Sequence, residues 1–278
     1  MYNFSIIIPS CGRDSLIECL KKVQKAIQRI DYVKFQIIVS DDDASEKTKS
    51  KVENLQLNIE YIIGPGRGPA ANRNNGAALA KGDWLIFTDD DCLPDKNWLR
   101  AFIKKIIDED KTIGYEGQIL PLGNLEADMA ECPVNTIGGC FWSANIAIKR
   151  NIFEKINGFD ENFPIAAFED IDIFIRLQRE GNIQFIKEAI VYHPVLVNSI
   201  WNNLLKVPKR LKSWVYLRQK HTCFHNTTLQ EIKRMTLDHL KNISKNLNKK
   251  KFCAVTILRL IVSPFLFLYY KNAKSPNE

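Results

Sequence analysis

The first 118 residues alternate between short apolar runs and segments with helical periodicity, and this alternation limits the folds that the chain can adopt. Four runs have the length and composition of buried strands: FSIIIP (4–9), FQIIVS (35–40), LNIEYII (57–63) and WLIF (84–87). In residues 15–30 and 70–81, the apolar residues recur at the three- to four-residue spacing of a helix. The order strand, helix, strand, strand, helix, strand predicts an α/β fold with a Rossmann-like, mainly parallel mixed sheet flanked by helices.

Two of these strands run directly into clusters of aspartate. The second strand is followed by SDDDAS (40–45) and the fourth by TDDDC (88–92). Parallel strands present their carboxyl ends at one edge of the sheet, where such folds bind ligands, so we expect the two clusters to converge. Converging carboxylates repel one another, and a divalent cation with a phosphate-bearing ligand would relieve the repulsion. Capping of helix N-termini is the structural alternative.

The middle of the sequence has a different pattern. The segment GGCFWSANIAIKR (138–150) places a glycine pair before a strand-like run. FEDIDIFIRLQREG (168–181) has apolar residues on one helical face and ends at a glycine, so it predicts a helix. Glu169 and Asp170 fall in its first turn, where the helix dipole favours anions for purely structural reasons. NIQFIKEAIVYHPV (182–195) indicates one or two short strands.

The C-terminal part is basic and partly apolar. KNISKNLNKKK (241–251) contains five lysines and no acidic residue. With no interleaved aromatic residues and no recognised module, it indicates an anionic lipid surface rather than nucleic acid. Residues 252–270 have the length of a membrane span but contain Arg259 and Pro264. A helix packed on the domain or in a homodimer, or one lying in the bilayer interface, is favoured over a span.

Composition excludes several other classes of protein. The seven cysteines are scattered and form no CxxC pair, so the sequence indicates neither a zinc site nor a disulfide framework. This cysteine usage is typical of a reducing compartment. No basic region or cleavage site precedes FSIIIP, so no signal peptide is expected. Together with the basic tail, these features predict a cytoplasmic protein that is peripheral at the inner face of the cell membrane.

Four elements follow one another in a recognisable order: FSIIIPSCGR, IIVSDDDAS, GPGRGPAANRNNGAALAKGDWLIFTDDDC and FEDIDIFIRL. Together they resemble the inverting family 2 glycosyltransferases with a GT-A fold, over about residues 3–195. The resemblance implies a metal-dependent enzyme that moves a sugar from a nucleoside-diphosphate donor to an acceptor hydroxyl. An acidic contact to a pyrimidine base is compatible with a UDP- or dTDP-sugar, and the basic tail predicts a glycan or lipid-linked acceptor in surface polysaccharide synthesis. The resemblance also divides the chain into a nucleotide-sugar-binding half (1–118), an acceptor-binding half (119–199) and a helical C-terminal extension (200–278).

The same resemblance implies roles for individual residues at the donor site. Contacts to the nucleotide and its diphosphate are implied for Pro9, Ser10, Arg13, Asp41, Asp42, Arg67, Arg73 and Asp90. A Mn²⁺ or Mg²⁺ ion would be bound by Asp89, Asp91 and His193, and it would stabilise charge on the departing diphosphate. A structural role remains the alternative for the histidine.

The transfer step also has implied residues. Asp170 corresponds to the family's general base, with Glu169 in support. We expect the N-terminus of the predicted helix to keep Asp170 ionised near neutral pH. Gly139, Trp142 and Asn145 correspond to the segment that lines the sugar and acceptor site, with a core role equally open for the tryptophan.

Other classes of nucleotide-binding protein fit less well. A nucleotidyltransferase would carry a glycine-rich loop after the first strand, whereas SCGRD has one glycine. A dinucleotide-binding oxidoreductase would carry GxGxxG there, whereas GPGRGP follows the third strand. A catalytically inactive protein that binds nucleotide-sugars or glycans on the same fold remains the alternative from a different class. It predicts loss of the acidic pair or of the base, and the sequence retains both.

Overall fold

A computed structural model describes residues 3–43, 45–109, 111–126, 130–197 and 199–221. The basic run at 241–251 and the apolar stretch at 252–270 lie outside the described residues. The chain forms two compact units, and the first contains 1–123, 132–161 and 169–194. The second contains 124–131, 162–168 and the chain from 195 onwards. The predicted boundaries at 118 and 199 stay predictions.

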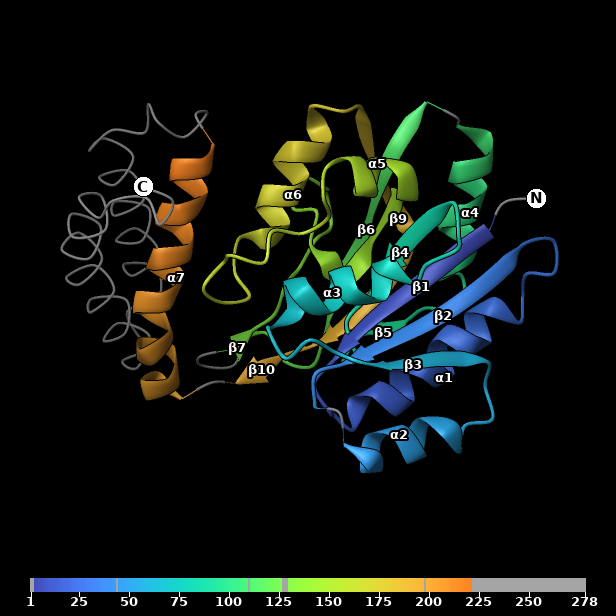
Figure 1. Ribbon diagram of the computed structural model, residues 1–278, viewed down its shortest axis with the longest axis horizontal. Helices are drawn as coiled ribbons and strands as arrows, with labels where there is room; N and C mark the ends of the chain where they lie inside the picture. The colour runs from blue at the N-terminus through green and yellow to red at the C-terminus, as the bar shows by residue number, and fades with distance from the viewer. Residues whose placement is uncertain (1–2, 44, 110, 127–129, 198, 222–278) are drawn as a thin grey trace. The chain divides into compact units, whose positions relative to one another are not determined.

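The first unit is built on an eight-stranded sheet in the order β3-β2-β1-β4-β8-β6-β9-β5 (Figure 1). The strands are β1 (Asn3–Ser10), β2 (Lys34–Asp41), β3 (Ile59–Ile63), β4 (Trp84–Phe87), β5 (Leu93–Pro94), β6 (Thr112–Leu122), β8 (Ile146–Lys149) and β9 (Asn182–Pro194). β1 to β4 are mutually parallel, as are β6 and β9, whereas β8 and β5 run antiparallel to their neighbours. The predicted mixed, mainly parallel sheet is therefore confirmed.

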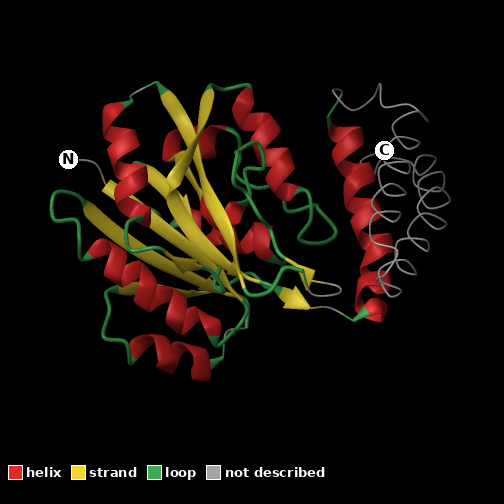
Figure 2. Ribbon diagram, turned by 180° about the vertical axis from the view of Figure 1, so that it is seen from behind, coloured by secondary structure: helices red, strands yellow, loops and turns green. Residues whose placement is uncertain are grey.

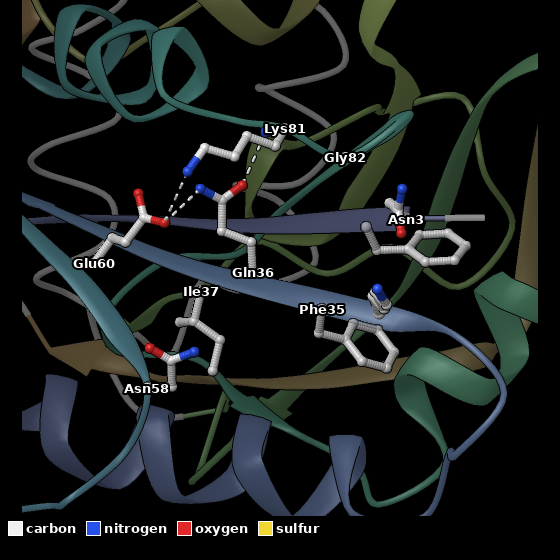
Figure 3. Close-up of a pocket in the computed structure, with 10 residues that line it drawn as sticks. Asn3, Phe35, Gln36, Ile37, Asn58, Glu60, Lys81 and Gly82 are labelled. Atoms are coloured by element: carbon white, nitrogen blue, oxygen red, sulfur yellow. Dashed lines mark hydrogen bonds and ion pairs between the residues drawn. The ribbon is translucent and has the colours of Figure 1, made fainter. Parts of the chain in front are cut away.

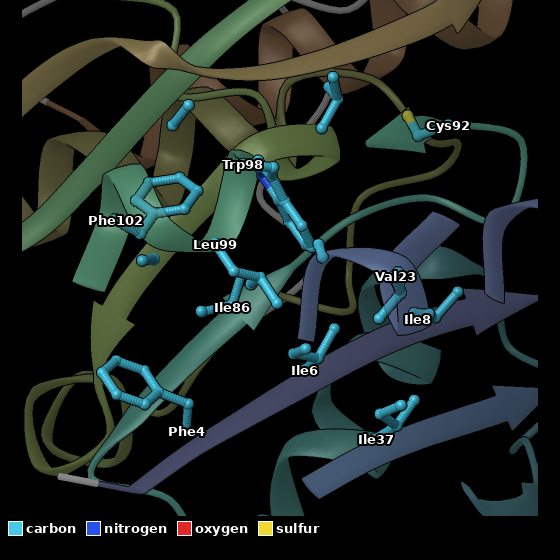
Figure 4. Packing of buried hydrophobic residues seen from close by; sticks show 14 of the residues in the cluster. Phe4, Ile6, Ile8, Val23, Ile37, Ile86, Cys92, Trp98, Leu99 and Phe102 are labelled. Carbon is cyan, nitrogen blue, oxygen red and sulfur yellow. The ribbon is translucent and has the colours of Figure 1, made fainter. Parts of the chain in front are cut away.

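Helices cover both faces of this sheet (Figure 2). They are α1 (Ser15–Ile27), α2 (Glu46–Glu53), α3 (Pro69–Ala78), α4 (Trp98–Asp108), α5 (Arg150–Lys155) and α6 (Glu169–Gln178), with a 3₁₀ turn at Ser143–Asn145. Side chains of a strand alternate between faces, so Ile6 and Ile8 of β1 join one core and Ile7 the other. Figure 4 shows Ile6 and Ile8 beside Val23 of α1 and Trp98 of α4. The opposite core contains residues of α3, α5 and α6.

The close approach of α3 to the sheet places the first functional residues. The helix begins with Pro69 after Gly68, whose φ of 92° few side chains tolerate. Within the helix, a Cβ added to Gly76 would lie 2.7 Å from the Ile7 side chain, so glycine allows the helix to lie against β1. This contact fixes α3 beside the carboxyl ends of β1 and β4, and with it Arg73.

The second unit contains two short strands and a long helix. β7 (Ala130–Glu131) pairs antiparallel with β10 (Leu196–Val197), and α7 spans Ile200–Lys220. An edge-to-face contact of 5.0 Å joins the rings of Phe163 and Tyr216. Helix α7 contains no acidic residue, and the predicted extension over 200–278 lies outside the described residues from 222 onwards. Among the described helices, none combines the length and apolar character that a membrane span needs.

Candidate active site

The aspartates after β2 hold the surrounding backbone in place. Asp41 is fully buried, and its carboxylate accepts hydrogen bonds from Gly12 N (2.9 Å), Asp43 N (3.1 Å) and the Tyr61 hydroxyl (2.6 Å). Burial and the neighbouring carboxylate raise the pKa of Tyr61, so its hydroxyl stays protonated and donates. Asp41 therefore has a structural role, which differs from the nucleotide contact expected from the sequence.

Asp42 points toward the glycine-rich loop that precedes α3. Its carboxylate accepts hydrogen bonds from Gly66 N (2.9 Å) and Gly68 N (3.3 Å). Ser10, at the end of β1, is buried and accepts a hydrogen bond at its carbonyl from Asn72 Nδ2 (2.8 Å). The ends of β1 and β2 and the start of α3 are therefore joined into one frame, and Pro9 lies buried within it.

The aspartates after β4 have a different set of partners. Asp89 pairs with Arg73, with Oδ1 and Nη2 2.8 Å apart. Asp90 pairs with Arg13 at 2.8 Å, and the same guanidinium lies 3.1 Å from Asp91 Oδ2. Burial raises the pKa of Asp90 to about 6. Two arginines thus offset the repulsion within this triplet.

Capping does not account for the triplet. Residues 89–91 lie between β4 and β5, and the N-cap of the next helix, α4, is Asn97. The helix-cap alternative is therefore wrong for these three aspartates. Their convergence with arginines from two other segments favours a ligand site at the carboxyl ends of the strands.

Asp91 and His193 form the part of the site that can hold a cation. His193 Nε2 lies 3.5 Å from Asp91 Oδ1, and Nδ1 lies 3.0 Å from the Pro194 carbonyl. A proton on Nδ1 would bond that carbonyl and leave the Nε2 lone pair facing Asp91. Asp91 Oδ1 is buried without a hydrogen-bond partner among the described residues. A carboxylate oxygen and an imidazole nitrogen suit Mn²⁺ or Mg²⁺.

Two neighbours complete the description of this cation site. Ligand atoms of Asp91, Cys92 and His193 all lie within 4.8 Å of one another. Burial raises the pKa of the Cys92 thiol, so it stays protonated and is a poor ligand. Asp89, predicted as a metal ligand, is engaged by Arg73 instead. The structure therefore brings two of the three predicted ligands together directly.

The acidic pair lies at the start of α6. Glu169 is buried, and its Oε1 lies 3.6 Å from Arg73 Nη1. Burial and the charge of Asp170 raise the pKa of Glu169 to about 8. Burial also raises the pKa of Asp170, against the opposing effects of Arg73 and of hydrogen bonds from Ser143. Glu169 therefore keeps its proton near neutral pH.

This result corrects the expectation for Asp170. The helix N-terminus was expected to keep its carboxylate ionised, but desolvation is the larger effect and raises the pKa. The ionised form of Asp170 is instead supported by Arg73 and Ser143.

The two predicted diphosphate arginines lie in different environments. The side chain of Arg67 is 66% exposed and forms an ion pair with Glu161 at 2.7 Å. The side chain of Arg73 is 6% exposed and faces the carboxylates of Asp89 and Glu169. Arg67 is therefore able to reach a ligand from the loop, whereas Arg73 is enclosed within the site.

A buried carboxylate that the sequence analysis missed organises the acceptor segment. Glu116 of β6 accepts hydrogen bonds from Gly139 N (2.5 Å), Phe141 N (2.8 Å) and Asn135 Nδ2 (2.9 Å). A cavity of about 420 Å³ opens beside this loop, lined by Glu116, Gly139 and Phe174 among others. The available signal was a single charged residue inside the otherwise uncharged strand TIGYEGQIL.

The other two predicted acceptor residues lie in the core. Asn145 is buried, and its amide donates to the carbonyls of Gln118 (2.8 Å) and Ala189 (2.7 Å) and accepts from Trp98 Nε1 (2.7 Å). Trp142 is partly buried against the core that contains α1 and α4. Asn145 thus joins three segments of the core, which differs from the sugar contact expected, and Trp142 agrees with its core alternative.

A second cavity lies at the opposite ends of the strands. It measures about 320 Å³ and is lined by residues at the amino ends of β1 and β2 and by Glu60 and Lys81 (Figure 3). Gln36 Nε2 donates to Glu60 at 2.9 Å, and Lys81 Nζ lies 3.8 Å from the same carboxylate. These three polar side chains pair with one another, and the cavity contains none of the predicted site residues.

The sheet and its helices form a GT-A fold, with an acidic candidate site at the carboxyl ends of the strands. Residues 5–117 match the family model described as glycosyl transferase family 2. The chain is 42% identical over 96 residues to the GalNAc(5)-diNAcBac-PP-undecaprenol beta-1,3-glucosyltransferase of Campylobacter jejuni, covering 33% of this chain and 30% of that protein. It is 25% identical over 215 residues to the probable glycosyltransferase YdaM of Bacillus subtilis, covering 68% and 50%.

Solved structures share the fold at lower identity. S. aureus TarS 1–349 in complex with UDP has a TM-score of 0.57 at 15% identity, covering 99% of this chain and 93% of that one. GalNAc-T7 with UDP, GalNAc and Mn²⁺ has a TM-score of 0.61 at 17% identity, covering 92% and 54%. The match to the family 2 model covers residues 5–117, which is less than half of the chain. The chain spans half or less of the length of the C. jejuni and B. subtilis relatives.

Proposed function

We propose that the chain is a metal-dependent, inverting glycosyltransferase that moves a sugar from a nucleoside-diphosphate donor to a hydroxyl group. The observation that carries this proposal is the convergence of three parts at one sheet edge. These parts are the Asp91–His193 pair, the Asp89–Arg73 ion pair and the Glu169–Asp170 dyad. A cation site beside a partly protonated carboxylate dyad supports chemistry in which a diphosphate leaves and a hydroxyl is deprotonated.

The donor would bind through the segments at the ends of β1 and β4. Asp91 and His193 would hold Mn²⁺ or Mg²⁺, which when bound neutralises charge on the departing diphosphate. Arg13 is about half exposed and lies against Asp90 and Asp91, so it can turn toward a phosphate as a cation takes its place. Arg67 offers a further exposed guanidinium.

Asp170 would act as the general base. It accepts the proton of the acceptor hydroxyl while that oxygen bonds to the anomeric carbon. The bond between the anomeric carbon and the diphosphate oxygen breaks, and the diphosphate leaves with the electron pair. A single displacement from the opposite face inverts the anomeric configuration. Glu169 keeps its proton and so avoids a second charge beside the base.

The relatives support a donor and an acceptor class. TarS binds UDP, and the printed name of the C. jejuni relative describes a lipid-linked acceptor. The proposed donor is therefore a UDP-sugar, and a dTDP-sugar is the alternative with a pyrimidine base. The proposed acceptor is a glycan or a lipid-linked glycan in surface polysaccharide synthesis. The cavity beside Gly139 offers space for part of the acceptor.

The proposal places the protein at the inner face of the cell membrane as a peripheral protein. Helix α7 exposes Lys206, Lys209 and Lys212, which supports peripheral contact with the anionic inner face of a membrane. The sequence also left open that the C-terminal extension packs in a homodimer.

The test is calorimetric titration of UDP, dTDP, GDP and CDP, each with and without Mn²⁺. We expect Mn²⁺-dependent binding of one pyrimidine nucleotide, and transfer of its sugar to be lost in Asp170→Asn while nucleotide binding is retained. Equal transfer by Asp170→Asn would remove the assigned base. Nucleotide binding without transfer to any acceptor glycan by the wild type would favour the inactive binding protein.

A further inference from the structure

Arg73 lies between the cation site and the acidic dyad. It comes from the first turns of α3, and its side chain is 6% exposed. One terminal nitrogen, Nη2, lies 2.8 Å from Asp89 Oδ1, and the other, Nη1, lies 3.6 Å from Glu169 Oε1. The guanidinium carbon also lies 5.5 Å from the ring centroid of Phe159, which encloses it from one side. A single cation therefore contacts both acidic groups.

The polar atoms around this guanidinium are incompletely paired. Arg73 Nε and Nη1 are buried without a hydrogen-bond partner among the described residues. The same holds for Glu169 Oε2 and Asp170 Oδ1. Buried polar groups are nearly always paired where their role is only to stabilise a fold. The unpaired atoms of Arg73, Glu169 and Asp170 therefore point to a role beyond stabilising the fold.

A second, partly buried arginine shows what a structural role looks like in this protein. Arg176 of α6 donates to Asp172 (2.6 and 2.9 Å) and to the carbonyls of Ile156 and Gly158 (2.7 Å each). All three of its nitrogens are used, and its partners join α6 to the end of α5. Arg73 uses one nitrogen within hydrogen-bond distance and directs the other toward the dyad.

We propose that Arg73 is a positioning residue that ties Asp89 of the cation site to the Glu169–Asp170 dyad, so that one guanidinium sets the position of both. The catalytic meaning of the dyad rests on the proposed function. The proposal replaces a direct contact of Arg73 with the donor diphosphate, which its burial and its two carboxylate partners do not favour. The cation and the base are then coupled through the protein even before a ligand binds.

The electrostatic consequence follows from the groups that face the dyad. These are Arg73 from α3, Asp89 from the β4–β5 connection and Ser143 from the 3₁₀ turn. Arg73 is the cation among these groups, and it opposes the burial that raises the pKa of Glu169 and of Asp170. Without it, three carboxylates would share a buried site, and Asp170 would ionise only at higher pH.

The first test needs no substrate. The folded protein holds the proton of Glu169 above the pH at which the unfolded chain releases it, so stability declines as pH rises from about 4.3 toward the folded-state value. Thermal unfolding is measured between pH 5 and 9 for wild type, Arg73→Met and Arg73→Met/Glu169→Gln. We expect the single variant to lose progressively more stability than wild type as pH rises. We expect the double variant to lose the part of that pH dependence that comes from Glu169, so its profile is shallower than that of the single variant.

The second test uses transfer. We expect Arg73→Met to move the acid limb of the kcat profile to higher pH by about one unit or more, because Arg73 lowers the pKa of Asp170 and a neighbouring opposite charge typically shifts a carboxyl pKa by one to three units. Arg73→Lys keeps the charge, so its limb stays near that of wild type. Arg150→Met, which removes an arginine paired with Glu154 outside the site, provides the control and leaves the limb unchanged.

The outcomes separate this proposal from the proposed function. An unmoved acid limb in Arg73→Met, with weakened affinity for UDP but not for UMP, would overturn the proposal and assign Arg73 to the diphosphate. A wild-type chain that binds no nucleotide would overturn the proposed function. In that case the unfolding profiles still decide the proposal, because parallel profiles for wild type and Arg73→Met would contradict it.

Discussion

The two aspartate triplets of this chain follow buried parallel strands and look alike in sequence, yet the structure gives them different partners. Asp41 and Asp42 accept hydrogen bonds from backbone N–H groups and a tyrosine, and they fix the loops around them. Asp89 and Asp91 face Arg73, Arg13 and His193, which are charged or titratable side chains. Backbone partners cannot leave without local unfolding, whereas side-chain partners can be exchanged for a ligand.

The difference shows how a site can be separated from a scaffold at the same sheet edge. The first triplet is satisfied by donors that belong to the fold, so its charges are already compensated. The second retains a buried carboxylate oxygen, Asp91 Oδ1, without a hydrogen bond among the described residues. The variants below test this contrast between a structural and a ligand-binding triplet.

The largest effect is expected at Asp91. Asp91→Ala removes the carboxylate that faces His193, so we expect kcat/KM for transfer to fall by about 10²- to 10³-fold, the scale typical of losing a principal electrostatic contact. Stability should change little, because Asp91 also pairs with an arginine whose side chain is about half exposed. Steady-state transfer and thermal unfolding are measured on the same preparation. Unimpaired transfer would assign the triplet to the scaffold.

A large effect of another kind is expected at Asp41. Asp41→Ala leaves Gly12 N, Asp43 N and the Tyr61 hydroxyl without their acceptor. Each unsatisfied buried group costs about 1–3 kcal/mol, and relaxation at this partly open site reduces the total, so we expect a loss of about 3 kcal/mol in the free energy of unfolding. Urea denaturation measures it. If Asp41→Ala were as stable as wild type, the triplet after β2 would have no structural role.

An intermediate effect is expected from the crowding around the second triplet and the dyad. Glu169→Gln removes the carboxyl whose pKa is raised to about 8, so the free energy of unfolding should fall less between pH 5 and pH 8 than it does in wild type. Each unit by which the pKa of Glu169 is raised corresponds to about 1.4 kcal/mol. Urea denaturation at pH 5 and at pH 8 measures this difference. An unchanged pH dependence of stability would show that Glu169 does not hold the proton.

The smallest effect is expected at Asp42. Its carboxylate accepts from Gly66 N and Gly68 N at the partly exposed loop before α3. Asp42→Ala should cost about 1 kcal/mol in the free energy of unfolding, because water can replace these bonds in part. Hydrogen exchange of the loop amides should become faster. A loss as large as that of Asp41→Ala would mean that the loop is held more rigidly than its exposure indicates.

The sequence contained enough information for the main architecture. Apolar runs predicted β1 to β4, and helical spacing predicted α1 and α3, because these elements bury a continuous face. Helix α2 was not predicted, since EKTKSKVE buries only Thr48 and Val52 and therefore lacks an apolar periodicity. Its local signal is the cap at Ser45, whose side chain accepts from Thr48 N.

The site was predictable at the level of which segments meet, and less so at the level of atoms. Parallel strands bring residues 41 and 89–91 to one edge, which the order of elements implied. The direction of each carboxylate depends on tertiary neighbours such as Tyr61 or Arg73, which no local pattern reveals. The same limit explains Asn145, whose amide joins three core segments.

The central claim is that the triplet after β4 binds a cation and a nucleotide whereas the triplet after β2 supports the fold. Calorimetric titration of UDP with Mn²⁺ into wild type, Asp91→Ala and the near-isosteric Asp41→Asn tests it most directly. We predict Mn²⁺-dependent binding by wild type, its loss in Asp91→Ala, and retention within about tenfold in Asp41→Asn, a difference of about 1.4 kcal/mol. Loss of binding in Asp41→Asn with retention in Asp91→Ala would contradict the account.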